Sequence, residues 1–353
     1  MKQTLLPLSL LSLIVASAFV GFAQERKVVV PANAAKPVGP YSPGIMIGDY
    51  LYVSGQGVRD ANSQMPAGIA AQTRQCLENV KAIVVAAGLT MEHVAHMQLY
   101  LERMSDLPAV ERVYVEYFPK NPPARVVLGV AKMPTDTTVE MTVVAARNLG
   151  DKKTLALKSL KPLGHASSAV TAGNRIYLSG IYGASAVELL TKLQSVLKEA
   201  RTSSTNILWR NEYSTTARVG IPMRELPAEA TLAMSLIASR QTVKEGGACR
   251  PDGKTIYCAA QSDDDAATVQ DQVKAVMQRL QAGLAAYGAN FAHVTASNVF
   301  LDDIGEFRLM NETYASFFAA APPTRTTVQP FPKAERVSGA TSLVRIAVVA
   351  VKE

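Results

Sequence analysis

Two stretches of sequence that lie 200 residues apart decide the fold. Residues 114–125 read YVEYFPKNPPAR and residues 314–325 read YASFFAAAPPTR, so a tyrosine, a phenylalanine, two prolines and an arginine recur at the same spacing. Further matches at this offset continue upstream without a gap: Val80 and Leu280, Gly88 and Gly288, His93 and His293, and Leu101 and Leu301. An offset that stays constant over this distance indicates two copies of one structural unit.

A third, shorter copy lies between these two. Tyr52-Val53-Ser54-Gly55 recurs as Tyr177-Leu178-Ser179-Gly180, and Ala124-Arg125-Val126 recurs as Ala217-Arg218-Val219. The stretch that would match residues 107–118 is absent from it. No Gly/Ser linker separates the copies, so we expect them to pack tightly. The predicted repeats cover residues 28–148, 155–241 and 242–353.

The periodicity of the first copy predicts a mixed α/β (α+β) unit. Apolar residues at helical spacing predict one amphipathic helix that ends at Gly88 and a second over residues 107–118. Alternating or β-branched runs predict strands at residues 50–54, 97–101, 125–131 and 139–145. These elements make a sheet with two helices on one face, and the other face has to be buried by the neighbouring copies. We therefore predict a built-in trimer, an intramolecular pseudo-trimer.

The N-terminus has the layout of a secretory signal peptide. Lys2 precedes the apolar stretch 5–22, and Gly21 and Ala23 place small residues at a cleavage site, which predicts a leader over residues 1–23. An uncleaved membrane anchor is the alternative, because the apolar run is about as long as a short spanning helix. Cleavage predicts an exported protein, periplasmic or secreted.

Three cysteines do not make a disulfide framework. Cys76 lies on the apolar face of the first helix and is expected to be a core residue. Cys249 and Cys258 flank the turn Arg250-Pro251-Asp252-Gly253 and could form a hairpin disulfide, provided that the two positions face each other across the strands. The sequence leaves both possibilities open.

Several motifs of the first copy resemble the RidA family. They are Gly39-Pro40-Tyr41-Ser42, Tyr52-Val53-Ser54-Gly55-Gln56, Pro123-Ala124-Arg125 and Val139-Glu140. The resemblance implies a chorismate-mutase-like fold with ligand pockets where neighbouring units meet. It also implies hydrolysis of reactive 2-imino and enamine acids to 2-keto acids and ammonia, without a metal or an organic cofactor.

The resemblance also implies site residues. In the first copy Arg125 would bind the substrate carboxylate, Glu140 would hold water or move a proton, and Tyr41, Ser54 and Gly55 would line the pocket. The matching substrate-binding residues in the other copies are Ser179, Gly180, Arg218, Asn311 and Arg325.

The second and third copies depart from the family's pattern. The second has Ala166 for the tyrosine and Ala233 for the glutamate, and the third has Ala259-Ala260 for Ser-Gly and Arg345 for the glutamate. Because pockets are shared between neighbours, Arg125 and Glu140 should face different neighbours. At most one or two of the three pockets would then be complete.

Two functions remain open from the sequence. One is a cofactor-free imine and enamine hydrolase, and the other is an exported, non-catalytic binding protein for small carboxylates. Nucleic-acid cleavage is disfavoured, because the formal net charge of +7 is spread along the chain and no catalytic His cluster is present. His93 and His96 lack the spacing and the carboxylate support of a metal site. The expected partner is a small 2-imino or 2-keto acid, with no nucleic acid and no membrane contact after cleavage, bound by a monomeric chain.

Overall fold

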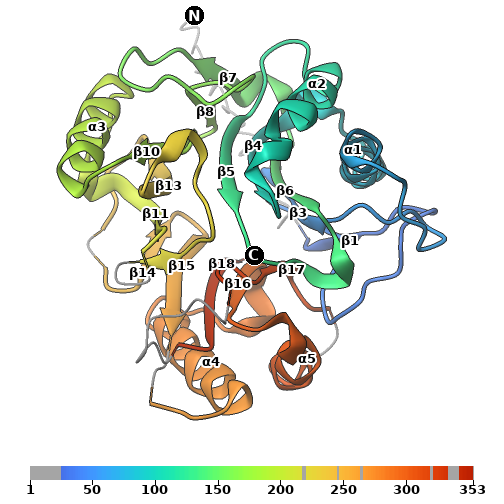
Figure 1. Cartoon of the computed structure of the whole chain (residues 1–353). Helices are drawn as coiled ribbons and strands as arrows, with labels where there is room; N and C mark the ends of the chain where they lie inside the picture. The colour runs from blue at the N-terminus through green and yellow to red at the C-terminus, as the bar shows by residue number, and fades with distance from the viewer. Residues whose placement is uncertain are drawn as a thin grey trace, which may run out of the picture.

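The computed structural model describes residues 25–216, 220–244, 246–262, 265–318, 321–332 and 342–352. The predicted leader and Arg218 therefore lie outside the described residues. Within these ranges the strands form three sheets, and each sheet with its helices is called a unit below. Figure 1 shows the three units around a common centre, with the helices on the outside. The predicted fold class of three α/β repeats is confirmed.

The first unit is a sheet with the strand order β1-β2-β3-β6-β4-β5, in which only the β4–β5 pair is parallel. Its strands are β1 (Lys27–Val29), β2 (Gly44–Ile47), β3 (Tyr50–Gln56), β4 (Val94–Leu101), β5 (Ala124–Gly129) and β6 (Val139–Ala146). Helices α1 (Ile69–Ala86) and α2 (Leu107–Tyr117) cover one face, at the places that the periodicity predicts.

The third unit repeats this topology with the order β14-β15-β18-β16-β17. Its strands are β14 (Cys249–Asp252), β15 (Thr255–Ser262), β16 (Val294–Leu301), β17 (Thr324–Val328) and β18 (Val344–Val351), and its helices are α4 (Val269–Ala285) and α5 (Phe307–Ala315).

The second unit has the order β12-β11-β13-β9-β8-β7, and β10 also pairs with β13. Its strands are β7 (Lys152–Leu155), β8 (Ala169–Ala172), β9 (Arg175–Leu178), β10 (Ile181–Gly183), β11 (Ile207–Ser214), β12 (Ile221–Pro222) and β13 (Leu232–Ser239). Helix α3 (Ala186–Glu199) lies on its outer face.

In the second unit, charged side chains lie on the part of the sheet that α2 covers in the first unit. In the first unit Met97 and Leu99 are fully buried in the core that α2 helps to form. The matching residues of β11 are Arg210 and Glu212, which are half exposed and form an ion pair at 3.1 Å. This exchange lets the second sheet face water where α2 would otherwise lie. Leu190, which matches the buried Leu77, is 48% exposed as a consequence.

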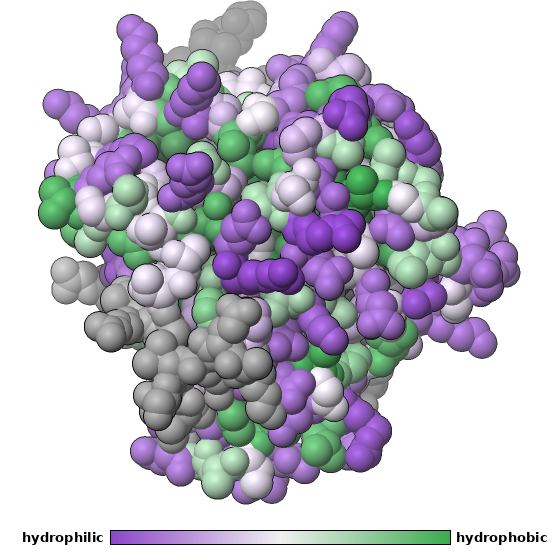
Figure 2. Space-filling view, viewed as in Figure 1, coloured by the Kyte–Doolittle hydropathy of each residue, from purple (hydrophilic) through white to green (hydrophobic). Residues whose placement is uncertain are grey.

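The inner faces of the three sheets form one shared core. Residues at matching positions of the three units meet there: Tyr52, Tyr177 and Tyr257, and Val144, Ile237 and Val349. Each sheet therefore buries its helix-free face against the other two, as the sequence predicts. Figure 2 shows strongly hydrophilic residues near the middle of the face where the units meet, and only scattered apolar residues around them. Among the described residues, no helix is both long and apolar enough to cross a bilayer.

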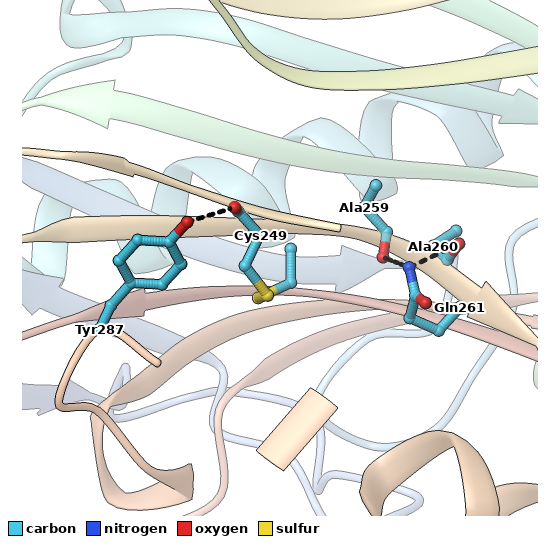
Figure 3. Close-up of a disulfide and its surroundings, with 6 residues drawn as sticks. Cys249, Ala259, Ala260, Gln261 and Tyr287 are labelled. Atoms are coloured by element: carbon cyan, nitrogen blue, oxygen red, sulfur yellow. Dashed lines mark hydrogen bonds between the residues drawn. A yellow bond between two sulfur atoms is a disulfide. The ribbon is translucent and has the colours of Figure 1, made fainter. Parts of the chain in front are cut away.

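Cys249 and Cys258 form a disulfide across the β14–β15 hairpin. The two cysteines are directly opposite in the ladder, with Cα atoms 4.0 Å apart. In the neighbouring pair of residues, the Ala259 N–H donates to the Ala248 carbonyl. Hydrogen-bonded and non-hydrogen-bonded pairs alternate in an antiparallel ladder, so the two cysteines form a non-hydrogen-bonded pair, in which opposite Cα atoms lie closest together. This register decides the alternative that the sequence leaves open. Figure 3 shows the bridge beside Tyr287, whose hydroxyl donates to the Cys249 carbonyl at 3.1 Å.

A glycine in α4 makes room for this disulfide. A Cβ added to Gly283 would lie 2.6 Å from the Cys249 Sγ. The first unit has the opposite arrangement, in which Gly44 of β2 lies under Ile83 of α1 and a Cβ on Gly44 would lie 2.6 Å from the Ile83 Cγ2. In the first unit the strand carries the glycine and the helix the larger residue, whereas in the third unit the helix carries the glycine and the strand the larger residue.

Replacing Gly283 with isoleucine should destabilise the protein. Overpacking against the disulfide costs about 1–3 kcal/mol, which exceeds the roughly 0.5 kcal/mol that leaving glycine gains in a helix. Urea unfolding of the oxidised protein measures the effect. Ala282→Ile, on the exposed side of the same helix, is the matched control and should change the midpoint little. Equal midpoints for the two variants would contradict the packing argument.

Candidate active site

A pocket between the first and third units brings together residues that the sequence analysis places in different repeats. Tyr41, Gly55 and Glu140 come from the first unit, and Arg325 comes from the third. Asn311 lies beside Arg325, because a Cβ added to Gly39 would lie 2.6 Å from Arg325 Nη2 and 3.0 Å from Asn311 Nδ2.

The loop before β2 attaches the first unit to the third at this pocket. The Ser42 N–H donates to the Pro323 carbonyl at 3.0 Å, and the Ser42 hydroxyl donates to the Pro322 carbonyl at 2.6 Å. Tyr41, the preceding residue, is thereby held with its ring 5.5 Å from the Arg325 guanidinium. The Pro-Tyr-Ser motif of the first unit and the Pro-Pro-x-Arg motif of the third unit therefore contact each other across the interface.

Arg325 is buried without an acceptor for its charge. The residue is 4% exposed, and its Nη1 has no hydrogen-bond partner in the described structure. Aromatic rings surround the guanidinium, with the centroid of Tyr314 at 5.1 Å and that of Phe307 at 5.5 Å. The Asn311 Oδ1 and the Thr327 Oγ1 are also buried and unpartnered there. A buried guanidinium that lacks an acceptor is a site for an anion, and a carboxylate matches its geometry.

Glu140 faces the same pocket from β6. Its residue is 6% exposed, and burial raises the pKa of its carboxyl to about 8, although the positive charge of Arg325 acts in the opposite direction. A Cβ added to Gly55 would lie 2.0 Å from the Glu140 Oε1, so glycine is required at this corner of β3. Among the described residues the Glu140 carboxyl forms no ion pair, which leaves it available to a ligand.

Burial also shifts the pKa values of the two groups beside Glu140. It raises the pKa of the Tyr41 phenol, an effect that the Val38 N–H donating to its oxygen partly opposes. It lowers the pKa of Arg325, because a cation is poorly solvated there.

Arg125 lies in a different interface, between the first and second units, and does not meet Glu140. Its guanidinium pairs with Glu111 and donates to the Leu163 carbonyl. Glu111 of the first unit corresponds to Asn311 of the third unit. The carboxylate that pairs with Arg125 therefore comes from the protein itself and not from a ligand. The offset of 200 residues relates Glu111 to Asn311, but nothing in the sequence predicts the pairing of Glu111 with Arg125.

Backbone contacts close this second interface. Ser179 Oγ accepts from the Arg125 N–H at 2.8 Å, and the Gly180 N–H donates to the Arg125 carbonyl at 3.0 Å. Tyr182 lies in the space beside Gly180, where an added Cβ would be 2.3 Å from its hydroxyl. The matching residue of the first unit is Gly57, which lines the open pocket. The offset of 125 between the two copies is the signal that relates Gly57 to Tyr182.

Ser54, the residue of the first unit that matches Ser179, has different hydrogen-bond partners. Its hydroxyl donates to the Pro43 carbonyl at 3.1 Å and accepts from the Gln56 side chain at 2.9 Å. The corner of β3 that carries Ser54 and Gly55 therefore stays open towards the third unit.

The interface between the second and third units lacks a carboxyl at the matching strand position. Arg345 stands there and donates to the Gly220 carbonyl, while Arg218 is outside the described residues. Ala259 and Ala260 replace the Ser-Gly corner, as Figure 3 shows, and the Gln261 side chain donates to both of their carbonyls. Within the described ranges, no group of three or more His, Cys, Asp or Glu side chains is arranged to hold a metal ion.

Comparisons with known proteins relate single units of this chain to whole proteins. A family model described as Endoribonuclease L-PSP matches residues 31–147 and 251–352. A RutC family protein of Saccharolobus solfataricus is 38% identical over 125 residues, which are 35% of this chain and 99% of that protein. The 2-iminobutanoate/2-iminopropanoate deaminase of Escherichia coli K12 is 35% identical over 125 residues, 34% of this chain and 98% of that protein.

Among solved structures, the YjgF gene product of Escherichia coli is 34% identical, and the match covers 35% of this chain and 99% of that one with a TM-score of 0.34. Each of these relatives thus corresponds in length to one unit of this chain.

The raised pKa of Glu140 predicts a pH dependence of stability. A carboxyl whose pKa rises from 4.5 in the unfolded chain to about 8 in the folded one stabilises the fold fully below pH 4.5, and this contribution is lost as the pH rises through about 8. The free energy of unfolding of the wild type should therefore fall over this window relative to Glu140→Gln. Urea unfolding at a series of pH values measures the difference.

Glu116→Gln serves as the control for this series. Glu116 is exposed and paired with Arg74, which lowers its pKa, so its replacement should leave the slope in this window unchanged. Parallel curves for wild type and Glu140→Gln would show that the Glu140 carboxyl is ionised at neutral pH.

Proposed function

The chain belongs to the Endoribonuclease L-PSP family, the RidA family, and from this premise we propose that it hydrolyses small 2-imino acids to 2-keto acids and ammonia in the pocket between its first and third units. The observation that carries the proposal is the buried Arg325 guanidinium, which has an unpartnered Nη1 and faces the same pocket as the Glu140 carboxyl.

Arg325 binds the substrate carboxylate in this proposal. A carboxylate accepts two parallel N–H bonds from a guanidinium, and such charge-assisted pairs are strong where water is excluded. The rings of Tyr41, Phe307 and Tyr314 exclude water around the guanidinium. The unpartnered Asn311 Oδ1 accepts a hydrogen bond from the substrate and fixes its orientation.

Glu140 moves the protons. Hydrolysis adds water across the C=N bond to give a carbinolamine, and the proton of its hydroxyl then moves to the nitrogen as the C–N bond breaks and the C=O bond forms. Both water protons thus leave with the nitrogen as ammonia, with no change in oxidation state. A carboxyl with a pKa of about 8 is protonated at neutral pH, so it donates to the imine nitrogen and accepts a proton from the attacking water in return. General acid–base catalysis is most effective when the pKa lies near the working pH.

We propose one working site per chain. At the first–second interface Glu111 neutralises Arg125 and Tyr182 occupies the space beside Gly180, and at the second–third interface Arg345 replaces the glutamate. We therefore assign the catalytic roles to Glu140 and Arg325, with Tyr41, Gly55 and Asn311 as binding residues, and give Arg125 a structural role.

We also propose that the protein works outside the cytoplasm as a monomeric chain. The Cys249–Cys258 disulfide supports export, because such bridges persist in oxidising compartments. The apolar leader-like sequence over residues 1–23 agrees with this location.

Arginine substitutions test the site directly. Arg325→Gln should lower kcat/KM for a 2-imino acid by on the order of 100-fold, because it removes a charge-assisted pair worth roughly 1.5–3 kcal/mol. Arg125→Gln is the matched control at the equivalent position and should leave kcat/KM nearly unchanged. The assay follows imino acids that an amino-acid oxidase generates in place, with circular dichroism confirming that both variants are folded.

The outcome also separates the proposal from its alternatives. Loss of activity in Arg125→Gln but not in Arg325→Gln would place the site at the other interface. A folded wild type that binds 2-keto acids without accelerating hydrolysis would instead be a binding protein for small carboxylates.

A further inference from the structure

A chamber lies in the shared core, where the inner faces of the three sheets meet. Its walls include Tyr52, Tyr177 and Tyr257, one from each unit. A second set of equivalent residues, His96, Trp209 and Ala296, also lines the chamber. His96 and Trp209 have aromatic rings, whereas Ala296 has none. The chamber has a volume of about 70 Å³, several times what one water molecule requires.

Two buried polar atoms in the wall have no partner. They are the Nε2 of His96, a residue that is 7% exposed, and the hydroxyl of Tyr257, which is 1% exposed. Each unmade hydrogen bond costs about 1–3 kcal/mol, so both atoms call for a partner inside the chamber. Burial lowers the pKa of His96 to about 4, which leaves the imidazole uncharged, and its ring stacks on Tyr177 at a centroid distance of 5.4 Å.

The neighbouring polar groups already have partners. The Asn298 side chain donates to the Gln98 Oε1 at 2.9 Å, and the Tyr100 hydroxyl donates to the same oxygen at 2.9 Å. Gln98 and Asn298 both line the chamber, and these hydrogen bonds hold Gln98 in place in its wall.

Arg175 contacts the chamber wall from the side of an open bowl. Arg175 lines an open polar bowl formed by the hairpin turns at Asp49, Asn174 and Gly253. Its Nη1 donates to the Tyr52 hydroxyl at 3.0 Å, and its guanidinium stacks 3.6 Å from the Tyr50 ring centroid. Tyr52 belongs to the chamber wall, so this hydrogen bond connects the bowl with the chamber.

We propose that the chamber binds a small uncharged molecule with one aromatic ring and one hydroxyl group, of the phenol type. The flat walls of His96, Tyr177 and Trp209 match an aromatic ring. A hydroxyl both donates to the His96 Nε2 and accepts from the Tyr257 hydroxyl. The neutral imidazole of His96 adds no charge to this part of the wall. Arg325 lines both this chamber and the Glu140 pocket, but His96, Tyr177, Trp209 and Tyr257 line only the chamber, and the proposal does not depend on the proposed hydrolysis.

Trp209 is the only tryptophan of the chain and lines the chamber, so its fluorescence reports occupancy. Titration of the full-length protein with phenol, with excitation selective for indole, should give a saturable change. Benzene, which lacks the hydroxyl and so both hydrogen bonds, should bind on the order of 10-fold more weakly, because each bond is worth roughly 0.5–1.5 kcal/mol.

Ala296→Leu fills the space and should abolish the phenol response. Where this variant fails to fold, His96→Phe provides the second test, and phenol should then bind no better than benzene. No saturable response in the folded wild type, or equal responses in wild type and Ala296→Leu, would overturn the proposal. A crystal structure from phenol-soaked crystals that shows only water in the chamber would also overturn it.

Discussion

The mutual burial of three helix-free sheet faces is the interaction on which the rest of the structure depends. Each sheet has helices on its outer face alone, so no unit can bury its inner face without the other two. The matching tyrosines Tyr52, Tyr177 and Tyr257 show how closely the units still correspond at this centre. The pockets between the units exist because this core fixes where their edges meet.

One chain also frees the three units from being identical. In an assembly of identical subunits a substitution appears at every interface, whereas here each interface has its own residues. The first–third interface keeps an arginine, an asparagine and a glutamate around an open pocket. The first–second interface has used the same positions for structural bonds, with Glu111 on Arg125 and Tyr182 beside Gly180. The Gly44–Ile83 and Cys249–Gly283 exchange shows the same independence inside the units.

The repeats, the helices and most strands could be predicted from the sequence, because apolar periodicity and a constant offset are local signals. The separation of Arg125 from Glu140 could be anticipated from the sharing of pockets. The partner of Glu140 could not be assigned, since nothing in the sequence says in which direction the three units follow one another around the centre. The direction found places Arg325 opposite Glu140. The disulfide depends on the strand register, which residue spacing alone does not fix. Tyr182, which fills the space beside Gly180, replaces a glycine whose role is visible only in three dimensions.

The covalent connection between the three units has a consequence for how the protein behaves when it is scarce. Separate subunits obey mass action, so an assembly built from them dissociates as its concentration falls, and each dissociation exposes an inner sheet face to aggregation. In a fused chain the neighbours are tethered, and their effective concentration does not change with dilution. The pocket between the first and third units therefore stays assembled at any dilution.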